Sequence, residues 1–379
     1  MTQTLQALLD GGVRSGVFPT AQAVVLKDGQ PVFEGTSGGA HPGSVYDLAS
    51  LTKVISTTPL FLSLWAEGRL GPDTPLSRFF PDSPAGQSGV TLADLLYHRS
   101  GLPAFVPYFS RAMPAVPELF QESCPAPVRA DVRREVVDAA AKTRLRQEVG
   151  AQAVYSDVGF ILLGDVLERV SGMPLDQLFE ARVARPLGLD LSFRRLSAKP
   201  ASGELPLPTG TTRPREPAPG QETMWQPFPL HPSRPGEVDD DNAWVMDGVS
   251  GHAGLFGTAA SVARYGQAVL DGFGGNAALA PAPLWMLALR RDARTPGSSR
   301  ALGFDTPSPE GSQAGSRIGR LAPGAVGHTG FTGVSLWIDL ARKLVVALCT
   351  NRTLPGRANV GIKDFRPRFH DAVVEALGL

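Results

Sequence analysis

The sequence predicts an α/β (α+β) protein in which helices flank an antiparallel sheet and a mostly helical lobe is inserted. Strand patterns cluster near both ends of the chain, and helical patterns fill its middle. If the terminal strands share one sheet, residues 1–55 and 299–379 form the sheet domain and residues 56–298 the helical domain. A chain of 379 residues is long for one core, which agrees with two lobes.

The predicted strands form two pairs. In "TAQAVVLKDGQPVFEG" two short apolar runs surround Asp28-Gly29, a pattern typical of a hairpin. Near the other end, "GVSLWIDL" and "KLVVALCTN" form a second pair, joined through Ala341-Arg342. The start, "MTQTLQALLDGGVRSGVF", indicates a short amphipathic helix, and the final "RPRFHDAVVEALGL" indicates another.

Three helices are predicted in the middle of the chain. "VGFILLGDVLERVSG" has apolar residues at helical spacing and Gly172 as its stop. "TLADLLYHRSGLP" begins with Thr91 as N-cap and stops at Gly101, and "DVRREVVDAAAKTRLRQEV" is a further helix. Residues 200–236 contain ten prolines and almost no periodicity, so we expect an extended surface loop that borders a cleft.

The composition excludes several classes of protein. Acidic and basic residues balance at 36 each, which does not favour nucleic acid or an anionic membrane as partner. Cys124 and Cys349 lie far apart without metal-type spacing, and we expect both to be buried. The chain shows no leader and no membrane-length apolar run. We expect a soluble, cytoplasmic protein as written, or a periplasmic or secreted one if a leader was removed; its oligomeric state is open.

One serine and one lysine lie three residues apart in "YDLASLTKVIS". On a helix such residues share a face, with Cβ atoms about 5–6 Å apart, so the Lys53 amine can reach the Ser50 hydroxyl. A serine hydroxyl is a weak nucleophile until a neighbour takes its proton. The alternative is a helix start with a capping serine and a solvated lysine, and the spacing alone favours that alternative.

Two further segments change this interpretation. "AVYSDVGF" places Tyr155 and Asp157 just before a predicted helix, and "GHTGFTG" places His328, Thr329 and Gly330 just before a predicted strand. Either segment alone could be a turn. Their order is informative: Ser-x-x-Lys on a helix, then Tyr-x-Asp in a loop, then His-Thr-Gly entering a strand.

This set resembles the penicillin-recognising serine hydrolases, whose motifs include Ser-x-x-Lys and Lys-Thr-Gly. The tyrosine in the second motif makes the chain similar to the class C β-lactamase branch, which includes D,D-carboxypeptidases and related esterases. "LLYHRSGLP", "GVSGHAGLFGTAASVARYGQAVL" and "GEVDDDNAW" are similar to further segments of that branch. The resemblance covers nearly the whole chain and implies a β-lactamase/transpeptidase-like fold, no cofactor and no metal, and a small-molecule or peptide-like substrate.

The resemblance also implies a role for each matching residue. Ser50 would be the acylated nucleophile, Lys53 would hold the proton network beneath it, and Tyr155 would be the general base. His328 would orient Tyr155 or a substrate carboxylate. The backbone N–H groups of Ser50 and Phe331 would form the oxyanion hole. The implied substrate-binding and oxyanion residues are Asp157, Thr329, Gly330 and Phe331.

The chain departs from the family pattern at three positions. Asp157 replaces the usual asparagine, and a carboxylate there would keep Lys53 protonated, leaving Tyr155 as a phenolate base; alternatively, Asp157 only caps the following helix. His328 replaces lysine and supplies less positive charge. Asp239 stands where similar sequences often carry histidine, and the sequence offers no mechanistic account of it.

The other histidines are predicted to be structural. We expect His98 to bond backbone at a helix end and His252 to pack in the glycine-rich turn of "SGHAGLFG". His41, His231 and His370 belong to no constellation, and the chain has no His-Glu-x-x-His, which argues against a zinc hydrolase.

Together these patterns predict a serine hydrolase that acts through an acyl-enzyme on an ester or amide. The departures favour a carboxylesterase or D,D-peptidase-like activity. The alternatives are a class C-type β-lactamase and a catalytically silent penicillin-fold binding module.

Overall fold

The computed structural model describes residues 2–379 except 122, 199–204, 218–219, 221–228 and 277–278. Five strands form one sheet in the order β2-β1-β10-β9-β8, and every neighbouring pair is antiparallel. The first and last parts of the chain thus share a sheet, and the predicted fold class is confirmed. The strands are β1 (Ala21–Lys27), β2 (Gln30–Ser37), β8 (Ala325–Thr329), β9 (Ser335–Asp339) and β10 (Leu344–Thr350).

Both faces of the sheet are apolar, because successive side chains of each central strand point to opposite faces and are apolar on both. Val24 and Ala347, which are paired across β1 and β10, belong to one apolar core, and the next pair, Val25 and Val346, belongs to the other. Successive side chains of a strand point to opposite faces, so a fully apolar strand needs cover on both sides. The tight hairpin between β1 and β2 has Asp28 at φ 52° and Gly29 at φ 78°, as the Asp-Gly pattern predicts.

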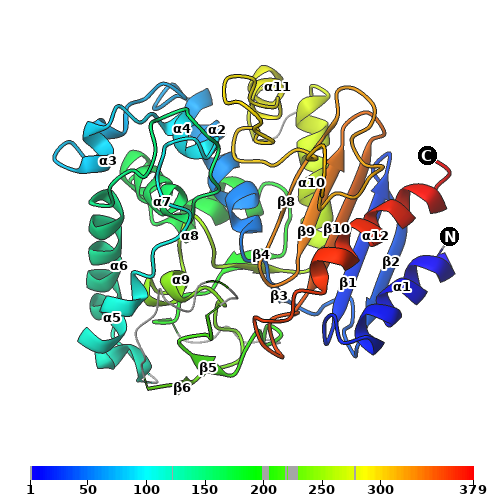
Figure 1. Ribbon diagram of the computed structural model, residues 1–379, viewed down its shortest axis with the longest axis horizontal. Coiled ribbons are helices and arrows are strands. Elements are labelled where there is room, and N and C mark those ends of the chain that lie inside the picture. The colour runs from blue at the N-terminus through cyan, green and yellow to red at the C-terminus, as the bar shows by residue number, and fades with distance from the viewer. Residues whose placement is uncertain (1, 122, 199–204, 218–219, 221–228, 277–278) are drawn as a thin grey trace.

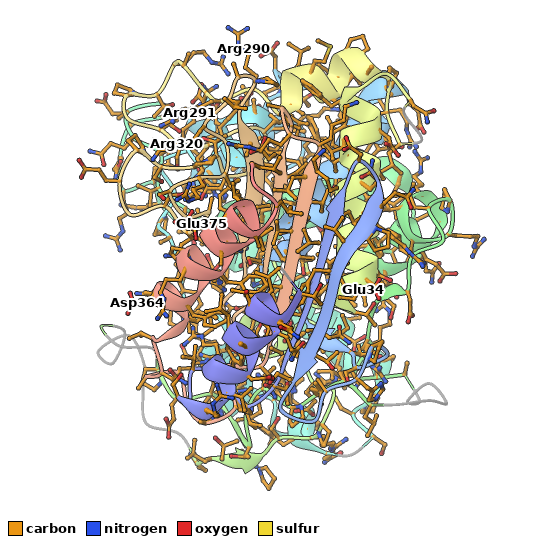
Figure 2. The ribbon with its side chains drawn as sticks, turned by 90° about the vertical axis from the view of Figure 1, so that its right-hand side faces the viewer. Glu34, Arg290, Arg291, Arg320, Asp364 and Glu375 are labelled. Carbon is orange, nitrogen blue, oxygen red and sulfur yellow. The ribbon has the colours of Figure 1, made fainter. Side chains whose placement is uncertain are left out.

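Helices supply this cover. α1 (Thr2–Arg14) and α12 (Ile362–Ala376) lie together on one face of the sheet, with the chain termini close to each other (Figures 1 and 2). α10 (Ala259–Phe273) packs against β1, β9 and β10 on the other face. Gly266 permits this approach, because a Cβ atom there would lie 2.5 Å from Val345 Cγ1. α10 therefore lies on the sheet, although its sequence falls in the predicted helical part.

The helical part and the α10 side of the sheet share one continuous core. The predicted division into two domains stays a prediction. The longer helices are α2 (Thr58–Ala66), α6 (Ala126–Ala141) and α7 (Asp157–Ser171), and α7 ends at Gly172 with φ 74°, as predicted. The shorter ones are α3 (Pro84–Gln87), α4 (Leu92–Leu96), α5 (Phe109–Ala115), α8 (Leu175–Phe179), α9 (Asp241–Val245) and α11 (Ala282–Ala288).

Two predicted helices end earlier than expected. The helix capped by Thr91 stops at Leu96, not Gly101, and the helix predicted over residues 131–149 is α6, which stops at Ala141. The segments that follow the two helices, around residues 99–101 and 146–150, bond each other instead. The N–H of Arg146 donates to the Gly101 carbonyl, and the N–H of Gly150 donates to the Arg99 carbonyl. This pairing satisfies backbone groups that helices would otherwise have used.

Short ladders complete the architecture. β3 (Tyr46–Asp47), β7 (Leu255–Gly257) and β4 (Leu191–Phe193) form a small sheet in the order β3-β7-β4. Residues 200–236 were predicted to be an unstructured loop, and their described part contains the ladder of β5 (Thr212–Arg213) and β6 (His231–Pro232). The rest of that stretch lies outside the described residues. No helix in the described part of the chain is both long and apolar enough to span a membrane.

Candidate active site

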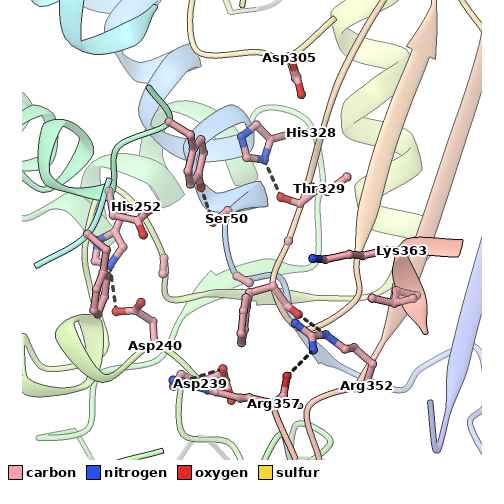
Figure 3. A pocket seen from close by; sticks show the side chains of 18 of the residues that line it. Ser50, Asp239, Asp240, His252, Asp305, His328, Thr329, Arg352, Arg357 and Lys363 are labelled. Carbon is pink, nitrogen blue, oxygen red and sulfur yellow. Dashed lines mark hydrogen bonds and ion pairs between the residues drawn. The ribbon is translucent and has the colours of Figure 1, made fainter. Parts of the chain in front are cut away.

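The predicted site residues converge on a cleft between the β8 edge of the sheet and the helical part (Figure 3). Seven of the eight line the cleft directly: Ser50, Tyr155, Asp157, His328, Thr329, Gly330 and Phe331. The eighth, Lys53, is fully buried beneath the floor of the cleft, and its Nζ donates a hydrogen bond to Ser50 Oγ. Segments that are up to about 280 residues apart in sequence therefore form one site, from residues 50 to 331.

A strained turn presents Ser50. It follows β3, and Ala49 has φ 45°, an uncommon value for a residue with a side chain. The N–H of Ala49 donates to Asp47 Oδ1 at 2.8 Å, which holds the turn in place. A helix begins directly after Ser50 and includes a π-helical turn at Lys53–Thr57, where a regular helix was predicted. π-turns within α-helices frequently occur at functional sites.

Two donors converge on the Ser50 hydroxyl oxygen. The Tyr155 hydroxyl donates to Ser50 Oγ at 2.7 Å, and Lys53 Nζ donates to the same oxygen at 3.0 Å. Both hydrogen bonds strengthen as negative charge develops on this oxygen. The geometry therefore favours ionisation of Ser50 during nucleophilic attack.

Lys53 has an acceptor for each of its three N–H bonds. Besides Ser50 Oγ, Nζ bonds the His252 carbonyl at 3.0 Å and forms an ion pair with Asp157 Oδ1 at 2.7 Å. Burial by itself would lower the pKa of Lys53, but the charges of Asp157 and Tyr155 outweigh it and the pKa lies above its ordinary value. Lys53 is therefore an ammonium at neutral pH, as the sequence predicts.

Asp157 does not cap the helix that it begins. The N-cap of α7 is Ser156, whose side chain accepts from the Gly159 N–H. The Asp157 carboxylate faces Lys53 instead. The alternative interpretation of Asp157 as a capping residue is therefore wrong.

Tyr155 is protonated in the resting site. Burial raises the pKa of its hydroxyl above 10, and the opposing effect of Lys53 is smaller. The resting group is a phenol that donates to Ser50 Oγ, and the predicted role of the phenolate as the working base stays a prediction. Phenolate is thus a minor form in the substrate-free protein, and the adjacent Lys53 ammonium, 4.9 Å from the ring centroid, favours it electrostatically.

His328 is a neutral imidazole. Burial lowers its pKa well below the ordinary value, and the nearby charges of Lys53 and Arg300 lower it further. Nδ1 donates to the Thr329 carbonyl at 2.7 Å, which fixes the tautomer and leaves Nε2 as an acceptor. Nε2 has no hydrogen-bond partner among the described residues. The ring lies 5.6 Å from that of Tyr155, and its predicted orienting role stays a prediction.

The two predicted oxyanion donors are unused. In the described part of the chain, neither the backbone N–H of Ser50 nor that of Phe331 donates to an acceptor. Ser50 precedes a helix, whose dipole favours negative charge at this end. A carbonyl oxygen in the cleft could receive both bonds.

Two other histidines also contact the site. His98 Nδ1 accepts the backbone N–H of Ser156, as predicted. His252 was expected only to pack in its turn, yet it lines the cleft, its carbonyl accepts from Lys53, and its ring joins Ser250 Oγ to Asp240. Its position in "SGHAGLFG", one of the segments that carry the family resemblance, could have indicated this.

An antiparallel sheet with a helical part beside it, and a polarised serine in the cleft between them, is the arrangement of a serine hydrolase. The chain belongs to the Beta-lactamase family, whose sequence model matches residues 5–365. A protein of Escherichia coli (strain K12) named "Putative D-alanyl-D-alanine carboxypeptidase" is 30% identical over 378 residues, which cover 88% of this chain and 79% of that protein.

Solved structures share the fold. The octameric penicillin-binding protein homologue from Pyrococcus abyssi matches with a TM-score of 0.69 at 18% identity, over 99% of this chain and 77% of that one. EstCE1, described as a hydrolase with promiscuous acyltransferase activity, matches with a TM-score of 0.64 at 22% identity, over 96% of this chain and 98% of that one. At these identities the likeness concerns the fold alone.

Proposed function

We propose that this protein hydrolyses an ester or amide through an acyl-enzyme on Ser50, with a D,D-peptidase-like or carboxylesterase activity. The observation that carries the proposal is the Ser50 hydroxyl, which receives hydrogen bonds from Tyr155 at 2.7 Å and Lys53 at 3.0 Å beside two unused backbone N–H groups. In the phenolate form of Tyr155, this arrangement would combine a nucleophile, a proton acceptor and two oxyanion donors.

In acylation, Ser50 Oγ attacks the substrate carbonyl carbon and its proton passes to Tyr155 in the phenolate form. The carbonyl oxygen becomes an oxyanion that accepts from the N–H groups of Ser50 and Phe331. When the tetrahedral intermediate collapses, Tyr155 returns the proton to the leaving alcohol or amine. Lys53 stays an ammonium throughout, held by Asp157 and the His252 carbonyl.

In deacylation, water takes the place of the leaving group. Tyr155 accepts a proton from the water as it attacks the acyl carbon, and then gives this proton to Ser50 Oγ as the ester bond breaks. The products are a carboxylic acid and the free enzyme.

Basic residues on one wall of the cleft, which is also lined by five aspartates, favour a substrate that carries a carboxylate. Arg352 and Arg366 lie on one wall and bond only backbone carbonyls, without a carboxylate partner in the described structure. Burial lowers the pKa of Arg352 to about 10 and that of Arg366 to about 9, so both remain cations at neutral pH. The exposed Lys363 side chain points into the same cleft (Figure 3).

Replacing Lys363 by methionine is expected to raise KM about five- to tenfold for an N-acyl-D-alanyl-D-alanine peptide, which ends in a carboxylate, because one attractive charge is lost. KM for the uncharged p-nitrophenyl acetate should stay within twofold. Steady-state kinetics on both substrates measure this. Lys142→Met, an exposed lysine outside the cleft, is the control, and equal changes for both substrates would contradict the carboxylate assignment.

Replacing Asp157 by asparagine is expected to move the ascending limb of the kcat/KM–pH profile to lower pH. The Asp157 charge raises the pKa values of both Lys53 and Tyr155. Without it, Tyr155, the proposed base, loses its proton at lower pH. Profiles recorded on a p-nitrophenyl ester from pH 6 to 10 give the shift. An unchanged profile would show that Asp157 is not coupled to the base.

Turnover on three substrate classes separates the candidate activities. We expect p-nitrophenyl esters to be hydrolysed faster than a chromogenic cephalosporin, because such esters need neither a cation at residue 328 nor an amide donor at residue 157. His328 is neutral and Asp157 is a carboxylate paired with Lys53. N-acyl-D-alanyl-D-alanine is the third class, and its turnover tests the D,D-peptidase-like activity. Faster cephalosporin hydrolysis would favour the β-lactamase alternative, and a protein inert to all three classes would favour the binding module.

A further inference from the structure

Asp239, the unexplained departure from the family pattern, lies at the centre of a buried charge cluster. The residue is 3% exposed, yet its carboxyl group is ionised. Oδ2 bonds Arg357 Nη2 at 3.1 Å, and Oδ1 lies 3.3 Å from Arg215 Nε. Burial would raise the pKa of Asp239, but the charges of Arg357, Arg215 and Arg213 together lower it below the ordinary value.

The backbone of Asp239 holds the turn that presents Ser50. Its N–H donates to Asp47 Oδ2 at 2.5 Å, while Asp47 Oδ1 accepts from the Ala49 N–H at 2.8 Å. One carboxylate thus links Asp239 to the strained residue directly before the nucleophile. The Asp47 carbonyl also accepts from Thr332 Oγ1 at 2.8 Å, so the same strand end contacts the turn that contains the second oxyanion donor.

The side chain of Asp239 is linked to Phe331, the residue of the second predicted oxyanion donor, through Arg357. Arg357, bonded to both the carboxylate and the carbonyl of Asp239, has its Cζ 5.3 Å from the centroid of the Phe331 ring. Arg352 lies 4.4 Å from the same ring, donates to the Phe331 carbonyl at 2.7 Å and to the Arg357 carbonyl at 3.2 Å. Phe331 is 40% exposed and lines the cleft, and two guanidinium groups lie beside its ring. Figure 3 shows Arg352 and Arg357 together in this cleft.

The two halves of the predicted oxyanion hole come from segments about 280 residues apart, the turn at Ser50 and the turn at Phe331. Oxyanion donors stabilise the transition state only when they are held in position before the reaction. Asp239 is linked to both segments. Its N–H bonds Asp47, which holds the turn of Ser50, and its carboxylate bonds Arg357, which lies beside Phe331.

We propose that Asp239 is a positioning residue of the oxyanion hole, which anchors Arg357 against Phe331 and, through Asp47, fixes the turn of Ser50. This inference rests on the proposed acyl transfer at Ser50. A neutral side chain of the same shape would remove the negative charge that Arg357 and Arg215 share, and Arg357 would be held less firmly beside the Phe331 ring.

The first test is Asp239→Asn, which keeps the size and the backbone N–H of the residue but removes its charge. On a p-nitrophenyl ester, we expect kcat to fall about 10- to 100-fold with KM within threefold, since displaced catalytic groups reduce rate in this range. The inhibition constant of an alkyl boronic acid, which forms a tetrahedral adduct with Ser50, should rise by a similar factor. Rates are expressed per site titrated with a fluorophosphonate, which removes the effect of misfolded protein.

Asp339→Asn is the matched control. Asp339 is also buried and ion-paired, with Arg342 at 2.9 Å, but it does not line the cleft. Its variant should show the kcat and the boronic acid affinity of the parent per titrated site. An equal loss of kcat in both variants would mean that any buried aspartate matters, which would overturn the assignment.

The second test is a double-mutant cycle with Arg357→Gln, which also serves if Asp239→Asn does not fold. If the two residues act on Phe331 together, the single variants lose similar rates and the double variant loses no more than the larger single loss. Additive losses, or a parent-like kcat for Arg357→Gln, would overturn the inference. A parent protein that neither turns over esters nor reacts with the fluorophosphonate would refute the proposed function itself, which is a distinct result.

Discussion

Ser50→Ala is expected to lower kcat/KM for a p-nitrophenyl ester by at least about 10⁴-fold, because removal of the nucleophilic serine of a serine protease costs about 10⁶-fold in kcat. The fold should persist, since Lys53 retains the His252 carbonyl and Asp157 as partners. Ester turnover and the urea unfolding midpoint of the purified variant measure these two effects.

The control for Ser50→Ala is Ser88→Ala, which removes a hydroxyl from an exposed residue outside the cleft. It should keep parental turnover. A Ser50→Ala protein with more than about a tenth of the parental rate and no contaminating esterase would show that Ser50 is not the nucleophile.

Lys53→Met is expected to have two large effects. Turnover should fall by at least about 10³-fold, because Ser50 loses a donor and the positive charge that favours the Tyr155 phenolate. The free energy of unfolding should fall by about 3–5 kcal/mol, because the partly buried Asp157 carboxylate would be left without its cation. Esterase kinetics and urea titration at pH 7 give both numbers.

The double variant Lys53→Met/Asp157→Asn separates the two effects. It removes both charges of the pair, and we expect it to regain at least half of the lost unfolding free energy while remaining inactive. Recovery of activity without Lys53 would contradict its role in the proton network, and no recovery of stability would show that the cost arises from packing.

Local patterns predicted four of the five strands of the main sheet, but not β8, which contains His328 and Thr329, residues predicted to precede a strand. The Asp28-Gly29 hairpin and the apolar runs of β9 and β10 can each be recognised within a short stretch of sequence. These runs are continuously apolar because helices cover both faces of the sheet. The ends of α4 and α6 were predicted less well. They depend on pairing between residues 99–101 and 146–150, a contact that no local periodicity indicates.

The site was predictable to the extent that family motifs mark it. Ser50, Tyr155 and His328 were found from short motifs, although only the fold brings them together. The resting protonation of Tyr155 could not be predicted, because it depends on burial as well as on charge. Asp239 and Arg357 also escaped prediction, since an ion pair between residues 118 positions apart leaves no pattern in a single sequence.

The most direct test of the central claim is intact-mass spectrometry of the protein exposed for seconds to a small panel of p-nitrophenyl esters and β-lactams, followed by peptide mapping. We expect a mass increase equal to the acyl group, located on the peptide that contains Ser50, which disappears as the acyl-enzyme hydrolyses. The Ser50→Ala variant should show no such increase. Product formation by the parent without any acyl adduct, or an adduct on another residue, would contradict the account.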